Sequence, residues 1–184
     1  MAQRLRSMTA DGYFSLPEQP HTQLIDGELI VDAPVLRHQR VVDHLNVELH
    51  LWARTGPGRG EVVGGPGVHL DDANVLVPDV VWVAEARRPG RGDKRFVGSP
   101  DLVVEVCSPA TWRFDTGTKR RHYEAAGTAE LWLVDTLADQ VRVLRRSVPE
   151  ASGFDVEVVL DRTATLTTPL LDGFALDLAA LFDR

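Results

Sequence analysis

Two β-branched runs constrain the fold of this chain most strongly. Val75–Val83 and Leu102–Cys107 are apolar enough to be central strands, covered on both faces of a sheet. Each run nevertheless contains a carboxylate, Asp79 directly after Pro78 and Glu105 in mid-run. A carboxylate there is costly unless a metal or a cationic side chain meets it. Two simpler interpretations stay open: a strand end with a solvated Asp79, and a structural ion pair between Glu105 and an arginine.

The remaining pattern predicts helices around these strands. Val42, Leu45, Leu49 and Trp52 form a helical stripe, which Gly56-Pro57 ends. The other expected elements are a short helix capped by Thr9, a type I′ hairpin in 24–31 around Asp26-Gly27, a bent segment 61–70, a loop 87–99, a helix 115–126 with Asp115 as N-cap, strands 131–134, 141–144 and 154–160, and a short helix capped by Asp177. We therefore predict one α/β (mixed α+β) domain over 1–184, with a mixed β-sheet flanked by helices and an N-terminal helix and hairpin.

Composition excludes several classes of protein. The net charge of −7 excludes a non-specific nucleic-acid coat, because such proteins neutralise phosphates with basic residues. No apolar run approaches the length of about 18 residues that spans a bilayer, and the N-terminus lacks the apolar core of a signal peptide. The single Cys107 cannot pair within the chain, which favours the reducing cytoplasm. We expect a cytoplasmic protein with no membrane partner.

Lys119 is the third residue of interest, because only two of the 20 basic residues are lysines. It lies near the start of a predicted helix, where a cation opposes the helix dipole, although an i,i+4 pair with Asp115 offsets this. A solvated surface lysine is the alternative. Read together, Asp79 and Glu105 can hold Mg²⁺ or Mn²⁺, which prefer oxygen ligands and lower the pKa of a bound water. Lys119 would then orient that water or neutralise developing charge.

The order Pro78-Asp79, Glu105-Val106-Cys107 and Lys119 resembles the PD-(D/E)XK nuclease signature, with its lysine moved to the following helix. More closely, the chain resembles the Uma-two family of restriction-endonuclease-like proteins. The matching pieces are Leu24-Ile-Asp-Gly-Glu-Leu, Arg37-His38-Gln39, Pro78-Asp79-Val80-Val81, Pro100-Asp101-Leu-Val-Val-Glu105-Val106, Ser108-Pro109-Ala-Thr111, Asp115 with Lys119 and Tyr123 at four-residue steps, and Leu131-Trp132-Leu133-Val134-Asp135.

The resemblance implies a restriction-endonuclease-like core, Mg²⁺ or Mn²⁺, a nucleic-acid substrate (DNA rather than RNA) and a homodimer. It assigns Asp79 and Glu105 to the metal and Lys119 to catalysis. Two positions depart from the family pattern. Gln23 stands where the family often has Glu, so Glu28 is a candidate replacement, and Cys107 stands where a plain E-x-K motif has its lysine.

Several further residues are candidates for supporting roles. His38 opens the second helix and Tyr123 follows Lys119 by one turn, although a helix-start polar residue and a core aromatic would have the same pattern. Asp101 is too far along the strand from Glu105, about 13 Å, to share its metal. The candidate phosphate contacts, which as solvated surface would look the same, are Arg87, Arg88, Arg91, Lys94, Arg95, Arg120 and Arg121. The alternative function is a non-enzymatic nucleic-acid-binding or regulatory protein with a decayed nuclease site.

Overall fold

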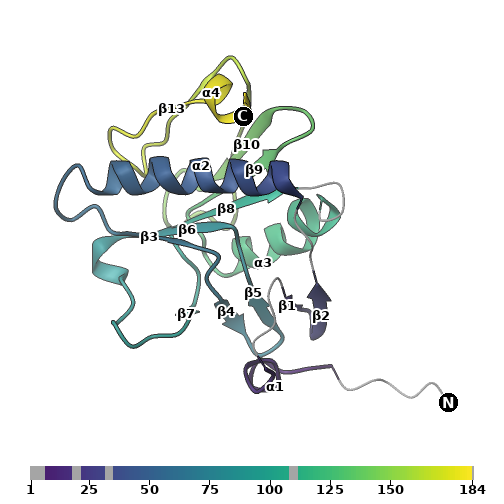
Figure 1. Cartoon of the computed structure of the whole chain (residues 1–184). Coiled ribbons are helices and arrows are strands. Elements are labelled where there is room, and N and C mark those ends of the chain that lie inside the picture. The colour runs from purple at the N-terminus through teal and green to yellow at the C-terminus, as the bar shows by residue number, and fades with distance from the viewer. Residues whose placement is uncertain (1–6, 18–21, 32–34, 108–111, 184) are drawn as a thin grey trace.

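A six-stranded mixed sheet forms the centre of the protein (Figure 1). The structure, a computed structural model, describes residues 7–17, 22–31, 35–107 and 112–183. The Ser-Pro-Ala-Thr motif at 108–111 lies outside the described residues. In spatial order the strands are β11 (Val156–Asp161), β10 (Gln140–Arg145), β9 (Glu130–Asp135), β8 (Leu102–Cys107), β6 (Val80–Val83) and β3 (Glu61–Gly64). β8 and β9 are parallel and the other neighbours are antiparallel, which confirms the predicted mixed sheet.

A second sheet lies beside the first and contains the predicted hairpin. Its order is β2 (Glu28–Val31), β1 (Thr22–Ile25), β5 (Asn74–Leu76), β4 (Val68–Asp71) and β7 (Phe96–Val97). The hairpin turn has positive φ at both Asp26 and Gly27, as a type I′ turn requires. A third, two-stranded sheet pairs β12 (Thr165–Leu166) with β13 (Leu176–Asp177).

Helices cover the central sheet as predicted. The long helix α2 (Leu36–Ala53) crosses one face and buries Val41, Leu45, Leu49 and Trp52 against it. The other helical elements are α1 (Ala10–Phe14, capped by Thr9), η1 (Glu85–Arg87), the π-helix η2 (Phe114–Lys119), α3 (Arg120–Ala125) and α4 (Leu178–Phe182, capped by Asp177). No helix among the described residues is long and apolar enough to cross a bilayer.

Strand β8 separates two packing environments. Its residues Val104 and Val106 belong to the core under α2, whereas Val103 and Cys107 pack with Tyr123 of α3 and with the second sheet. Because side chains alternate along a strand, Glu105 points to the same side as Cys107, toward α3. This alternation places the Glu105 carboxylate beneath the π-helix rather than under α2.

Some predicted elements differ from the structure. Val75–Val83 is not one strand: β5 belongs to the second sheet and β6 to the central sheet, and the chain crosses between them at residues 77–79. Pro78 lacks the N–H that a continuous ladder needs at this crossing. The predicted loop 87–99 contains the short strand β7, which pairs in parallel with β4.

The helix predicted at 115–126 begins earlier, with helical residues from Trp112 onward. Asp115 therefore does not cap it; Asp115 lies inside η2, where its carboxylate turns inward to Lys119. The predicted end is confirmed: α3 ends at Ala125 and Gly127 follows with a φ of 88°.

Candidate active site

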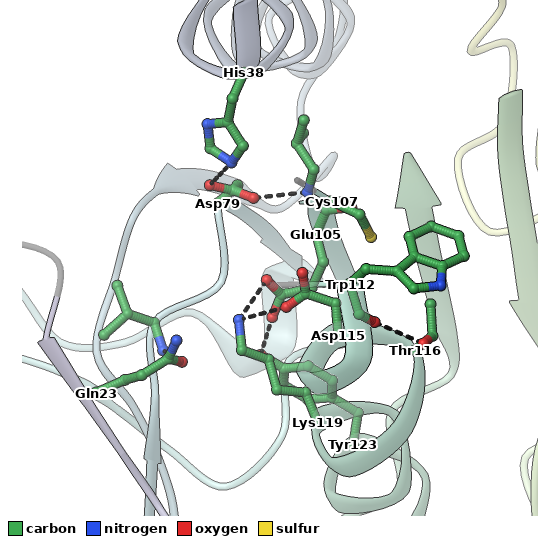
Figure 2. Close-up of polar contacts among 12 residues, drawn as sticks. Gln23, His38, Asp79, Glu105, Cys107, Trp112, Asp115, Thr116, Lys119 and Tyr123 are labelled. Atoms are coloured by element: carbon green, nitrogen blue, oxygen red, sulfur yellow. Dashed lines mark hydrogen bonds and ion pairs between the residues drawn. The ribbon is translucent and has the colours of Figure 1, made fainter. Parts of the chain in front are cut away.

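Asp79 lies beside strand β8 at the point where the chain crosses between the two sheets. Val80, the first residue of β6, pairs with Val104, so the antiparallel register brings the preceding Asp79 next to Glu105. Asp79 Oδ2 accepts a hydrogen bond from the Val106 N–H at 2.7 Å. Its Oδ1 lies 3.3 Å from His38 Nε2, on the first turn of α2 (Figure 2). The Asp79 carboxylate is thus held between a strand backbone and a buried histidine.

Glu105 is buried, with 2% of its surface exposed. The Tyr123 hydroxyl donates to Oε1 at 2.7 Å, and the Lys119 ammonium donates to Oε2 at 2.8 Å. Burial raises the pKa of Glu105; the Lys119 charge opposes this rise, and the Asp115 and Asp79 charges add to it. The two donors favour the ionised carboxylate that burial disfavours.

Lys119 is equally buried and lies between two carboxylates. Its Nζ is 2.8 Å from Glu105 Oε2 and 3.0 Å from Asp115 Oδ1. Burial by itself would lower the pKa of Lys119, but the charges of Glu105 and Asp115 outweigh it and the pKa is raised. Lys119 is therefore a protonated ammonium, and the solvated surface lysine of the alternative interpretation is wrong.

The π-helix η2 explains how one short segment supplies both Asp115 and Lys119. Its wider turn runs from Phe114 to Lys119, and both charged side chains are buried on its inner side. Such π-helical turns are uncommon and occur often at functional sites. The predicted i,i+4 pair of Asp115 and Lys119 is confirmed, and it lies in the interior rather than on the surface.

Cys107, Gln23 and Glu28, which the sequence also singled out, lie on three different strands. Cys107 is buried on the same face of β8 as Glu105, and burial raises the pKa of its thiol. Gln23 is buried on β1, where its Oε1 accepts from the Val77 N–H at 3.4 Å. Glu28 is exposed at the start of β2, and no hydrogen bond or ion pair among the described residues joins it to the cluster. The structure thus brings Cys107 to the site and leaves Glu28 apart.

Some of the basic residues predicted to meet phosphates have acidic or aromatic partners. Arg87 pairs with Asp101 at the far end of β8, and Arg88 pairs with Glu61 and Glu85. The guanidinium of Arg95 lies 3.8 Å from the ring centre of Phe14. Arg120 and Arg121 begin helix α3, directly after Lys119. Asp101, the aspartate of the second Pro-Asp pair, lies directly before Leu102 at the start of β8, where it pairs with Arg87.

The donor chemistry of the cluster fits a hard divalent cation. Asp79, directly before β6, and Glu105 on β8 offer carboxylate oxygens. Mg²⁺ is commonly held by one or two carboxylates, with water and substrate phosphate completing its shell. Within the part of the chain that the structure describes, no three His, Cys, Asp or Glu side chains are spaced to hold an ion.

Comparison with known proteins agrees with this fold. The model of the Uma2 family, described as "Putative restriction endonuclease", matches residues 10–179, so the chain belongs to that family. The chain is also similar to a solved structure from Anabaena variabilis ATCC 29413, titled a putative nuclease belonging to DUF820. That similarity has a TM-score of 0.81 at 21% identity and covers 95% of this chain and 97% of the other. None of the curated proteins compared matches the chain.

Proposed function

We propose that this protein is a metal-dependent endonuclease that hydrolyses phosphodiester bonds of nucleic acid, with DNA as its substrate. One observation carries the proposal: Asp79 and Glu105 are neighbours on adjoining chain segments, and Lys119 reaches Glu105 from the following helix. This is the arrangement expected for a nuclease signature whose lysine has moved. The family match and the similarity to a solved putative nuclease support the same class of reaction.

Each residue of the cluster has a separate role in this proposal. Asp79 and Glu105 would hold Mg²⁺ or Mn²⁺, which supplies a water of lowered pKa and polarises the phosphodiester. Lys119 neutralises charge beside the reacting phosphate. His38 fixes the Asp79 carboxylate and Tyr123 fixes that of Glu105, so both act as positioning residues.

The alternative, a nucleic-acid-binding protein with a decayed site, has one observation in its favour. Gln23, whose Oε1 accepts from the Val77 N–H, is a neutral amide where the family pattern described above often has Glu. The nuclease assay separates the two functions, because a decayed site would bind nucleic acid without cutting it.

The test is cleavage of plasmid and single-stranded DNA with Mg²⁺ or Mn²⁺ by the parent and by Asp79→Asn and Glu105→Gln. Asp101→Asn is the matched control, because Asp101 follows a proline in the same way but pairs with Arg87 at the other end of β8. We expect the parent and the control to cut, and the two site variants to lose at least about 10²-fold in rate. Equal cleavage by all four proteins would overturn the proposal.

We also propose that the protein acts in the cytoplasm as a homodimer. Two-fold homodimers are the commonest soluble oligomers, and such a dimer would carry two copies of the site. Strand β11 supports this proposal, because it is an outer strand of the central sheet with Val158 and Val159 exposed. Exposed strand edges of this kind offer their backbone groups to another chain.

A further inference from the structure

Two aromatic side chains are exposed at the start of the π-helix that carries Asp115 and Lys119. Trp112 and Phe114 each have 37% of their surface exposed. The other three tryptophans, Trp52, Trp82 and Trp132, are buried at 9%, 6% and 0%. The side chains of Trp112 and Phe114 are mostly buried, yet each keeps more than a third of its surface open to solvent on the segment that also carries Asp115 and Lys119.

The geometry of the turn separates the Trp112 ring from the charged cluster. Asp115 and Lys119 point inward to Glu105, whereas Figure 2 shows the Trp112 ring pointing away from them, on the Cys107 side. The Thr116 hydroxyl donates to the Trp112 carbonyl at 2.6 Å and fixes the first turn. The same short segment therefore carries the charged pair of the candidate site on its inner side and the exposed Trp112 ring away from that pair.

Positive charge accompanies the aromatic rings. Arg113 lies between Trp112 and Phe114 and is exposed, and Arg120 and Arg121 follow the π-helix. This local charge contrasts with the net −7 of the whole chain. Alternation of aromatic and basic side chains suits a single strand, because bases stack on the rings while guanidinium groups meet the phosphates.

We propose that Trp112 and Phe114 stack on unpaired bases next to the scissile phosphate, so that the enzyme acts on single-stranded nucleic acid or on unpaired ends and junctions. This inference rests on the proposed nuclease function and names the substrate class of that same site. Bases inside an intact duplex are already stacked on each other and present no open face to a ring. The occupant of this surface is therefore a splayed strand.

Two measurements in EDTA, where hydrolysis is suppressed, test the inference. The first is the affinity of a labelled single-stranded oligonucleotide and of a blunt duplex of the same sequence for the parent, Trp112→Ala, Trp112→Phe and Phe114→Ala. Val148→Ala is the matched control, because Val148 is exposed and follows β10. The last residue of β10, Arg145, pairs with Glu130 at the end of the sheet away from Cys107. The second is tryptophan emission during the titration, since Trp112 alone of the four tryptophans is exposed.

We expect Trp112→Ala and Phe114→Ala each to weaken single-strand binding about 5- to 150-fold, with little effect on duplex binding. Trp112→Phe and Val148→Ala should stay within about threefold of the parent. Single strands should quench the parent emission and leave that of Trp112→Phe unchanged. Thermal unfolding checks that each variant is folded.

Several results would overturn the inference. If the parent binds and cuts DNA but Trp112→Ala binds single strands as tightly as the parent, the stacking role is wrong and the nuclease function stands. Equal losses on single strand and duplex would contradict the choice of substrate. A dimer that dissociates in Trp112→Ala would assign the surface to a second copy of the chain. If the parent neither binds nor cuts nucleic acid, the proposed function fails together with the inference.

Discussion

Replacing Lys119 by Met removes the cation at the centre of the cluster and keeps most of its volume. Glu105 and Asp115, which lie 2.8 Å and 3.0 Å from the ammonium, would then face each other in the interior without a countercharge. Breaking a buried ion pair by removing one partner costs about 3–5 kcal/mol. For a chain of this length, that loss lowers the melting temperature by roughly 6–20 °C.

The structure also predicts the pH dependence of this loss. Lys119 lowers the pKa of Glu105, so its removal raises that pKa further above the value in the unfolded chain. A folded carboxylate with a raised pKa binds more protons than the unfolded one, and stability therefore increases as the pH falls toward the unfolded pKa. The deficit of Lys119→Met should be largest at pH 8 and smaller at pH 5.

The assay is urea unfolding at both pH values, with thermal melting as a second measure. Lys94→Met is the matched control, because Lys94 is the other lysine of the chain and is exposed in the loop before β7, where a substitution changes stability by about 0.5 kcal/mol or less. Adding Asp115→Asn to Lys119→Met should recover part of the loss. A deficit below about 1 kcal/mol, equal at both pH values, would refute the reasoning.

The remaining predictions concern catalysis, the core and assembly. Lys119→Ala should lower the rate of hydrolysis by about 10²–10³-fold and should keep the Mn²⁺ binding measured by calorimetry. Adding Cys107→Lys should restore part of the rate, because residue 107 lies on the same face of β8 as Glu105. An activity of Lys119→Ala equal to that of the parent would contradict the role of Lys119. Glu130→Gln should raise the free energy of urea unfolding at pH 7, and the stabilities of variant and parent should converge near pH 4. The reason is that burial raises the pKa of Glu130 despite hydrogen bonds from Thr168 and Trp132. A variant less stable than the parent at pH 7 would contradict this. Light scattering should give twice the 20.3 kDa chain mass, and a constant monomer mass over a tenfold concentration range would exclude the dimer.

Much of this fold could be predicted from local sequence signals. The hairpin at Asp26-Gly27, the helix caps Thr9 and Asp177, and strand β8 each depend on residues close together in the chain. The break between β5 and β6 was signalled by Pro78, but the partition of the two strands into different sheets depends on long-range pairing. Local pattern does not specify which sheet a short apolar run joins.

The candidate site was partly visible in the sequence for a different reason. Asp79 and Glu105 stand out because a carboxylate in an apolar run requires a partner, and Lys119 stands out because the chain otherwise uses arginine. The inward position of Asp115 was not predicted, because its place before a helical pattern equally suits an N-cap. The earlier start of the helix at Trp112 places Asp115 inside the helix rather than at its cap.

The most direct measurement of the central claim is a crystal soaked with Mn²⁺ and recorded at the manganese absorption edge. The account predicts an anomalous peak bonded to carboxylate oxygens of Asp79 and Glu105, with Lys119 nearby, and no peak at this place in Asp79→Ala. Calorimetry in solution should show Mn²⁺ binding by the parent that the same substitution abolishes. A soaked crystal with no peak between the two carboxylates, together with undiminished Mn²⁺ binding by Asp79→Ala and Glu105→Ala, would contradict the account.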